Sequence, residues 1–179
     1  MMFRRLGLIN REQRGFTLVE ILVALAITGL IVGGIAVAII QVFSVNASAS
    51  NRMTAVRQVQ SAGYYISRDA EMAQDVNTDD NPGTIDVIEL VSLRWTDWNG
   101  VQYQSDYTIN VDDRELKRSY TAGGQTTENI IARYIDPDTG NTNCQMDEDR
   151  LVLTITASIE GFKPASETRV YEVIPRPSV

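Results

Sequence analysis

The 179-residue sequence contains no histidine and only one cysteine. Without histidine the chain cannot form a Ser-His-Asp or Cys-His nucleophilic pair, a His-ligated zinc site or a histidine general base. The single cysteine, Cys144, excludes an internal disulfide and a cysteine-rich metal site. The net charge of −7 argues against a nucleic-acid partner. No pair of carboxylates has a setting that suggests acid–base catalysis, so we expect a protein that is not an enzyme.

The charges are distributed unevenly along the chain. Residues 1–15 carry a net charge of +3, which leaves −10 for the remaining 164 residues. No charged side chain occurs at the 31 positions between Glu20 and Arg52. The sequence therefore divides into a basic N-terminal leader, an apolar segment and an acidic body. The basic residues of the leader are Arg4, Arg5, Arg11 and Arg14.

The apolar segment is long enough to cross a membrane. Residues 21–40 are uncharged, and a helix of that length rises about 30 Å, the thickness of a bilayer hydrocarbon core. Because all four leader arginines precede it, the positive-inside rule places residues 1–15 in the cytoplasm and the body outside. The alternatives are a plain uncleaved anchor and a secretory signal cleaved near residues 47–49. The apolar stretch is much longer than the roughly 7–15 residues typical of such signals.

One carboxylate, Glu20, stands at the start of the apolar run, where an ionised side chain is costly unless it has a partner. Residues 14–20 read Arg-Gly-Phe-Thr-Leu-Val-Glu. This run resembles the cleavage and methylation motif of type IV prepilins and type II secretion pseudopilins. The resemblance implies that a membrane-embedded prepilin peptidase cuts between Gly15 and Phe16 and then methylates the new N-terminus at Phe16.

The resemblance also implies an assembly role. Glu20 would become the fifth mature residue, and its carboxylate would pair with the Phe16 amine of a neighbouring subunit, because an unpaired buried charge is destabilising. The implied partners are the prepilin peptidase, other pilin or pseudopilin subunits, an inner-membrane assembly platform and, before assembly, membrane lipid. The expected location is the inner membrane, as a single-pass protein with its N-terminus inside and its body periplasmic or extracellular, and then a pilus or pseudopilus.

The rest of the chain predicts an α+β, pilin-like fold. After a leader over residues 1–15, we expect a transmembrane or filament-core helix over 16–43 and its amphipathic continuation over 44–76, where apolar and small residues recur at helical spacing. A β-rich body follows over 77–179, in which alternating segments predict five to seven antiparallel strands. The order of these segments resembles the minor pilins and pseudopilins of the J and W types.

The body offers three weaker candidates for function. Asp136 and Asp138 are candidate calcium ligands, with a solvated acidic turn as the alternative; otherwise no cofactor or metal is expected. Cys144 is predicted in a polar loop, as a free thiol or as a cross-link to another subunit. Four aromatic residues form either an exposed patch for a partner or part of the sheet core. They are Trp95, Trp98, Tyr103 and Tyr107.

A function of a different class also fits part of the sequence. The chain would then be a secreted or membrane-anchored binding module, with a conventional signal peptide or an uncleaved anchor. That hypothesis does not explain why Gly15 and Glu20 stand at this spacing, directly before the apolar segment.

Overall fold

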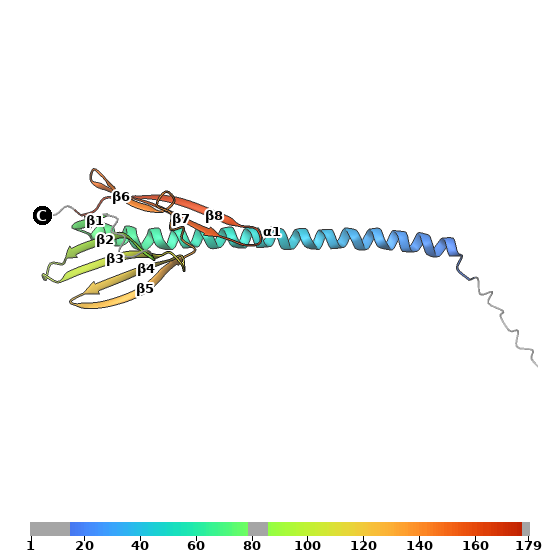
Figure 1. The fold of residues 1–179 in the computed structure, drawn as a ribbon, viewed down its shortest axis with the longest axis horizontal. Helices are drawn as coiled ribbons and strands as arrows, with labels where there is room; N and C mark the ends of the chain where they lie inside the picture. Colours follow the sequence, from blue (N-terminus) through green and yellow to red (C-terminus); the bar gives the residue numbers. More distant parts are fainter. Residues whose placement is uncertain (1–14, 79–85, 177–179) are drawn as a thin grey trace, which may run out of the picture. The chain divides into compact units, whose positions relative to one another are not determined.

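The computed structural model of the protein describes residues 15–78 and 86–176 (Figure 1). The leader arginines Arg4, Arg5, Arg11 and Arg14 lie outside these residues, as does most of the turn that the sequence predicts over 77–83. The described chain contains one helix, α1 (Leu18–Met72), followed by eight strands. It divides into two compact units, Met1–Phe43 and Ser44–Val179, and each is described here by itself.

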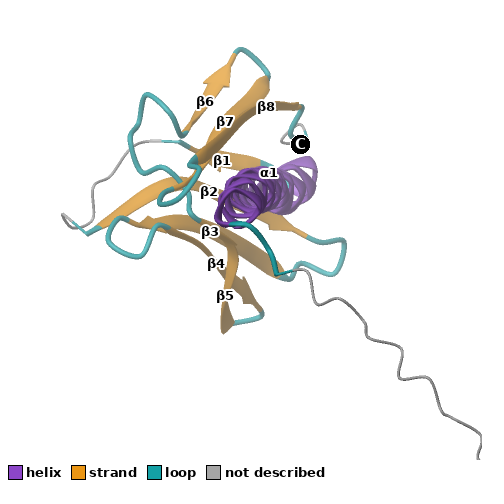
Figure 2. Ribbon diagram, turned by 90° about the vertical axis from the view of Figure 1, so that its right-hand side faces the viewer, coloured by secondary structure: helices purple, strands orange, loops and turns teal. Residues whose placement is uncertain are grey.

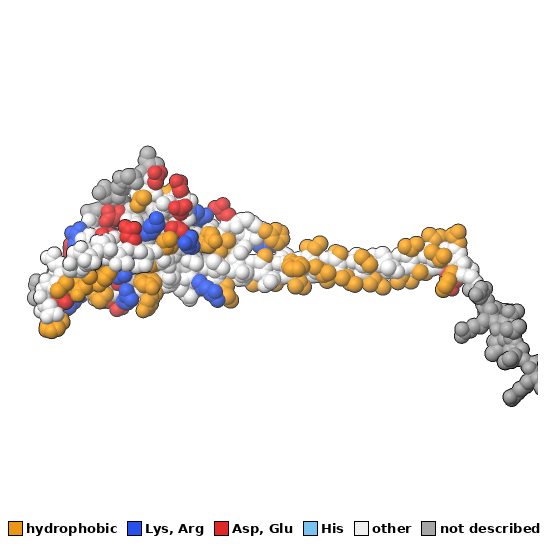
Figure 3. All heavy atoms as spheres, turned by 90° about the horizontal axis from the view of Figure 1, so that it is seen from below, with side chains coloured by type: hydrophobic (Ala, Val, Ile, Leu, Met, Phe, Trp, Pro, Cys, Tyr) orange, Lys and Arg blue, Asp and Glu red, His pale blue; other side chains and the backbone are white. Residues whose placement is uncertain are grey.

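The described part of the first unit consists of a short extended start and the N-terminal part of α1. Its side chains are exposed throughout, and Figure 3 shows hydrophobic groups along its visible face. The hydroxyl of Thr28, the one polar side chain between residues 21 and 40, donates to the carbonyl of Ala24 at 2.7 Å, so it presents no unpaired donor. By length and composition this segment can cross a membrane.

The second unit is an α+β body in which the C-terminal part of α1 packs against two antiparallel sheets (Figure 2). The larger sheet has the order β1-β2-β3-β4-β5 and the smaller one the order β6-β7-β8. The predicted fold class is therefore confirmed. The strands are β1 (Asp75–Asn77), β2 (Val87–Thr96), β3 (Gln102–Asn110), β4 (Glu115–Ala122), β5 (Gln125–Arg133), β6 (Asn143–Asp147), β7 (Arg150–Ile159) and β8 (Ala165–Val173).

The eight described strands exceed the five to seven predicted from the sequence. The two strands without an alternating pattern of their own are β1 and β6, which have three and five residues. Segments this short are defined by the strand beside them, β2 for β1 and β7 for β6. A single sequence therefore carries little signal for either.

The hydrophobic core of the body lies where α1 meets the sheets. The predicted helical stripe is buried at Val59, Gly63, Ile66, Ala70 and Ala73. Its small residues allow strands to approach the helix closely, and the branched residues fill the space between. The sheets contribute large, fully buried side chains, each of which stabilises the fold by about 1.5–3 kcal/mol. Among them are Leu93, Ile109, Leu116, Leu151, Leu153 and Ile155.

The helix ends at Met72, a few residues before the predicted end near residues 75–76. The backbone amide of Gln74 donates to the carbonyl of Arg94 at 2.9 Å, and residues 75–77 pair with β2 as an added edge strand. The side-chain carbonyl of Gln74 accepts a further bond from the amide of Thr96 at 3.0 Å. Pairing with β2 therefore ends the helix, an outcome of tertiary contact that helical periodicity cannot reveal.

Candidate functional site

The N-terminal segment places Glu20 in the first turn of α1 and Thr17 directly before the helix. The amide of Glu20 donates to Thr17 Oγ1 at 3.2 Å, and the amide of Thr17 donates to Glu20 Oε2 at 3.3 Å. This reciprocal pair is a capping box, which satisfies backbone donors that a helix start otherwise leaves free. Sequence reasoning missed this role, although the Thr-x-x-Glu spacing is its signal.

The two residues at the predicted cleavage position are exposed. Phe16 has 81% of its surface accessible, and it lines a shallow groove with Glu20 on one face of the helix start. No atom lies within 4 Å of the position that a Cβ on Gly15 would occupy, and its backbone is outside the left-handed region. The described fold therefore does not itself require glycine at residue 15.

The predicted calcium ligands are engaged in hydrogen bonds within their own loop. Asp136 Oδ1 accepts from the amide of Asp138 at 3.1 Å, and Asp138 Oδ1 accepts from the amide of Gly140 at 2.8 Å. The amide of Asn141 donates to the backbone carbonyl of Asp138 at 2.8 Å. These bonds form a turn of the kind that aspartate favours. Within residues 15–78 and 86–176, no three acidic, cysteine or histidine side chains lie together as a metal site. Calcium binding stays a prediction.

The four aromatic residues do not act as one group. Tyr107 is fully buried under α1, whereas Trp98 is 93% exposed on the turn between β2 and β3. Trp95 stacks on Tyr103 with ring centroids 5.6 Å apart, and Tyr120 lies next to both rings. Tyr107 therefore belongs to the core and Trp98 does not, because burial on a sheet depends on which face each residue occupies. A partner for the exposed ring stays a prediction.

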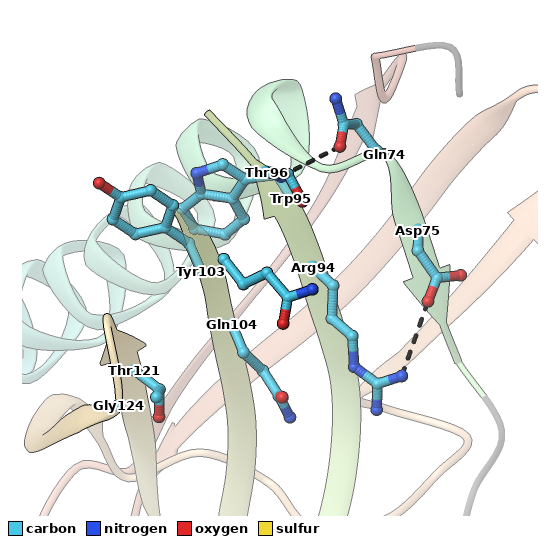
Figure 4. Close-up of a pocket in the computed structure, with 10 residues that line it drawn as sticks. Gln74, Asp75, Arg94, Trp95, Thr96, Tyr103, Gln104, Thr121 and Gly124 are labelled. Carbon is cyan, nitrogen blue, oxygen red and sulfur yellow. Dashed lines mark hydrogen bonds and ion pairs between the residues drawn. The ribbon is translucent and has the colours of Figure 1, made fainter. Parts of the chain in front are cut away.

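A surface cavity of about 380 Å³ lies beside the aromatic stack, where β1 joins the larger sheet (Figure 4). Four of its polar residues contact one another in two pairs. Figure 4 shows Arg94 turned toward Asp75, with Nη1 and Oδ2 3.7 Å apart, and Gln74 turned toward Thr96. The exposed ion pair is worth at most about 1 kcal/mol. Asp75, the one carboxylate in the lining, is paired with Arg94, so the cavity reflects how the edge strand is attached.

The prediction that Cys144 lies in a polar loop is wrong. Cys144 is buried in β6, opposite Leu153 of β7, where pairing with β7 brings the thiol into the core. Burial raises the pKa of the Cys144 thiol to about 12. A cross-link to another subunit would therefore require this strand to open.

We expect the Cys144 thiol to react slowly with iodoacetamide at pH 8 in the folded protein. The thiolate is the reactive form, and with a pKa of about 12 only about one thiol in ten thousand is ionised at pH 8. Mass spectrometry of a labelling time course, with and without denaturant, measures the difference. Equal rates in the two conditions would contradict the buried position.

A buried polar cluster, which sequence reasoning did not identify, joins α1 to the larger sheet. Asp69 is fully buried and accepts hydrogen bonds at 2.7 Å from Ser105 Oγ, Tyr107 Oη and Arg118 Nε. Burial and the neighbouring Asp69 carboxylate raise the pKa of Tyr107 well above its ordinary value. Arg118 also lies 4.4 Å from the centre of the Tyr120 ring. The cluster is a structural contact between helix and sheet. The Asp69 carboxylate is occupied by hydrogen bonds within the cluster, so it is not available to accept a proton from a substrate.

These features define a class of protein: a pilin-like α+β protein in which an exposed, apolar N-terminal helix continues into a body with antiparallel sheets. The family model described as "Prokaryotic N-terminal methylation motif" matches residues 10–36. The matched motif supports a type IV pilin- or pseudopilin-like structural subunit, and together with the apolar helix it supports membrane anchoring. Searches of curated proteins and of solved structures found no match for this chain.

Proposed function

We propose that the chain is a minor pilin or pseudopilin, a structural subunit of a type IV pilus or type II secretion filament. The observation that carries this proposal is the methylation motif at the start of an apolar helical segment, residues 18–43 of α1, whose side chains are all exposed. A surface this apolar needs cover, from lipid before assembly and from neighbouring helices afterwards. The apolar run is longer than that of a conventional signal peptide, and a charged motif stands at its start. Both features argue against the alternative, a binding module with such a signal peptide.

Prepilin peptidase is the proposed processing partner, with cleavage between Gly15 and Phe16. The exposed start of the chain leaves this bond accessible. Because nothing in the described fold occupies the space beside Gly15, the need for glycine there comes from outside the chain. A protease cleft that closes tightly around an extended backbone supplies that need. The leader arginines would hold residues 1–15 on the cytoplasmic side.

Cleavage at this bond leaves the capping box intact and adds a charged amine next to it. Thr17 and Glu20 both lie on the mature side, and the two bonds from Thr17 use only Oε2 of the carboxylate. A carboxylate has further acceptor capacity, so it can cap its own helix and also bind an ammonium. We therefore assign Glu20 two roles, a local cap and an ion pair with the Phe16 amine of a neighbouring subunit during assembly on the inner-membrane platform.

Intact-mass measurement and N-terminal sequencing of the protein from cells test the cleavage. We expect loss of 15 residues and gain of one methyl group, with sequence beginning at Phe16. Gly15→Ala should keep the leader attached while leaving the circular dichroism of the purified chain unchanged, since its methyl group has room. Loss of about 49 residues, or of none, would favour the signal-peptide or anchor alternative. Processing of Gly15→Ala at the normal rate would remove the proposed role of the glycine.

The two roles of Glu20 can be separated by substitution. Glu20→Gln keeps an oxygen for the cap but removes the charge, so we expect normal cleavage and strongly reduced incorporation into filaments. Thr17→Ala keeps the charge but weakens the cap by about 0.5–2 kcal/mol, and incorporation should persist. Immunoblots of sheared filaments against membrane fractions measure both. If Glu20→Gln assembles like the unsubstituted protein, the capping role stands alone and the ion pair is refuted.

A further inference from the structure

Strand β8 forms one edge of the smaller sheet and leaves its outer side open. Within residues 15–78 and 86–176, β8 pairs with β7 over all nine of its residues without a bulge, and no strand lies on its other side. It contains neither proline nor lysine, two residues that commonly block pairing at a sheet edge. The outward backbone groups of β8 can therefore bond a further strand.

The larger sheet ends in a second open edge, the first six residues of β5; Figure 2 shows β5 and β8 as outer strands of their sheets. Ser61 of α1 donates to the carbonyl of Ile131 at 2.7 Å, and the amide of Arg133 donates to Gln58 Oε1 at 2.7 Å. The helix thus covers only the end of this edge. Residues 125–130 are exposed on both faces of the sheet, pair with β4 alone in the described chain, and also lack proline and lysine.

A surface groove of about 430 Å³ lies between β8 and α1. Tyr64 and Arg68 line it from the helix, and Arg169 and Tyr171 line it from the strand. Tyr64 is 62% exposed, and its ring lies 5.8 Å from the Arg68 guanidinium carbon. A groove beside an open sheet edge is the arrangement in which an added strand bonds through its backbone and places alternate side chains in a pocket.

Contacts with α1 show in which direction the two open edges run. The turn before β8 is bonded to α1 at Asn51, and Tyr171 near the end of β8 is bonded to α1 at Val59, so β8 runs in the direction of the helix. The two bonds between α1 and β5 have the opposite order, because the later residue of the strand is bonded to the earlier residue of the helix. Two copies of the body in the same orientation therefore present β5 and β8 to each other as antiparallel strands.

We propose that a second copy of this chain adds its open β5 edge, residues 125–130, as a strand to β8. Backbone hydrogen bonds join the two sheets, and alternate side chains of the added strand enter the groove beside α1. On the faces away from α1, the joined sheet brings together Val170 and Ile130, which are 58% and 45% exposed in the single chain. Each edge thus offers the other both unpaired backbone groups and an exposed branched side chain.

The contact is heterologous, because each copy uses a different edge toward each neighbour, and such a contact can repeat along a filament. The inference rests on the proposed role as a filament subunit, but it needs neither cleavage after Gly15 nor the Glu20 ion pair. Its test uses the purified, uncleaved chain. A negative result there leaves the proposed function to be decided by the mass and shearing experiments, and the reverse also holds.

The experiment uses the full chain in liposomes at high protein density, in a Cys144→Ala background. Two separately purified variants, Val170→Cys and Ile130→Cys, are reconstituted together and treated with a short bismaleimide. We expect a cross-linked heterodimer on gels and by intact mass, and little product when either variant is reconstituted alone. Trp98→Cys replaces Ile130→Cys in the control, because Trp98 is 93% exposed but lies on the turn between β2 and β3. Circular dichroism confirms that all variants fold.

A charge on the edge makes the test quantitative. Residue 130 pairs with Lys117 in β4, so Ile130→Glu suits the fold of the single chain while removing the apolar contact with a second copy. Energy transfer between copies labelled at Trp98→Cys then measures association. Ile130→Glu should raise the protein density needed for half-maximal transfer about tenfold, whereas Met146→Glu, at a similarly exposed residue of β6, should not.

Three results would overturn the proposal. The first is a cross-link between residues 170 and 130 that does not exceed the control with residue 98. The second is a dominant product between two copies of Val170→Cys, because that result identifies a symmetric contact of β8 with itself. The third is an equal effect of Ile130→Glu and Met146→Glu on energy transfer.

Discussion

Asp69→Ala should lower the free energy of unfolding of the body by about 3–5 kcal/mol. The substitution leaves the Arg118 guanidinium, whose side chain is only 11% exposed, without its carboxylate. It also removes the shared acceptor of the Ser105 and Tyr107 hydroxyls. A buried charge that loses its partner costs far more than the pair contributes when intact. Urea denaturation of the full chain in detergent, followed by near-ultraviolet circular dichroism, measures the loss.

Two variants show whether the loss comes from the buried network. Glu172→Ala removes one partner of an ion pair with Arg150 in which both side chains are about half exposed, and we expect a change below about 1 kcal/mol. In Asp69→Leu combined with Arg118→Met, apolar side chains replace both charges, so much of the stability should return. Similar losses for Asp69→Ala and Glu172→Ala would show that the network does not hold α1 to the sheet.

Gly63→Ala should lower the free energy of unfolding by about 1–3 kcal/mol, although alanine is the better helix former. A Cβ on Gly63 would overlap the Tyr171 ring, far inside van der Waals contact distance. Tyr171 crosses α1 here, and its hydroxyl donates to the backbone carbonyl of Val59 at 3.1 Å. The added methyl group must displace the ring from the helix and break this bond. Thermal and urea unfolding of the full chain measure the effect.

A double-mutant cycle isolates the contact between Gly63 and Tyr171. Once Tyr171→Ala has removed the ring, the methyl group of Gly63→Ala has space, and the substitution should become neutral or stabilising through helix propensity. The exposed Gly29, which has no atom near its Cβ position, provides the matched control for alanine in the same helix. A Gly63→Ala cost that persists in the Tyr171→Ala background would mean that the ring is not its cause.

Both predictions concern the attachment of the sheets to α1, on which the proposed function relies. The Asp69 cluster fixes the helix to β3 and β4, and Tyr171 fixes it to β8. Ser61 adds a bond to the carbonyl of Ile131 in β5 at 2.7 Å. A subunit that assembles through its N-terminal helix carries its body along only if such contacts resist separation.

Several features followed from the sequence alone because they depend on local order along the chain. The uncharged run after Glu20 determines a helix able to cross a membrane, since length and composition set that property. The spacing of Gly15, Phe16 and Glu20 is likewise a property of the order of residues along the chain, and the family model matched the same segment. The alternation of apolar and polar residues was enough to predict most of the strands and the α+β class.

The tertiary structure decided what depends on contacts between distant residues. In the sequence, Asp69 is one of several charged residues near the end of an amphipathic helix. It is a buried hydrogen-bond acceptor only because Arg118, 49 residues later in the chain, lies beside it in the fold. Cys144 became a core residue for the same reason, since its neighbour Leu153 comes from another strand. The end of α1 was set by pairing with β2. Helical periodicity records which residues share a face, but burial and partners are fixed only when separate segments meet.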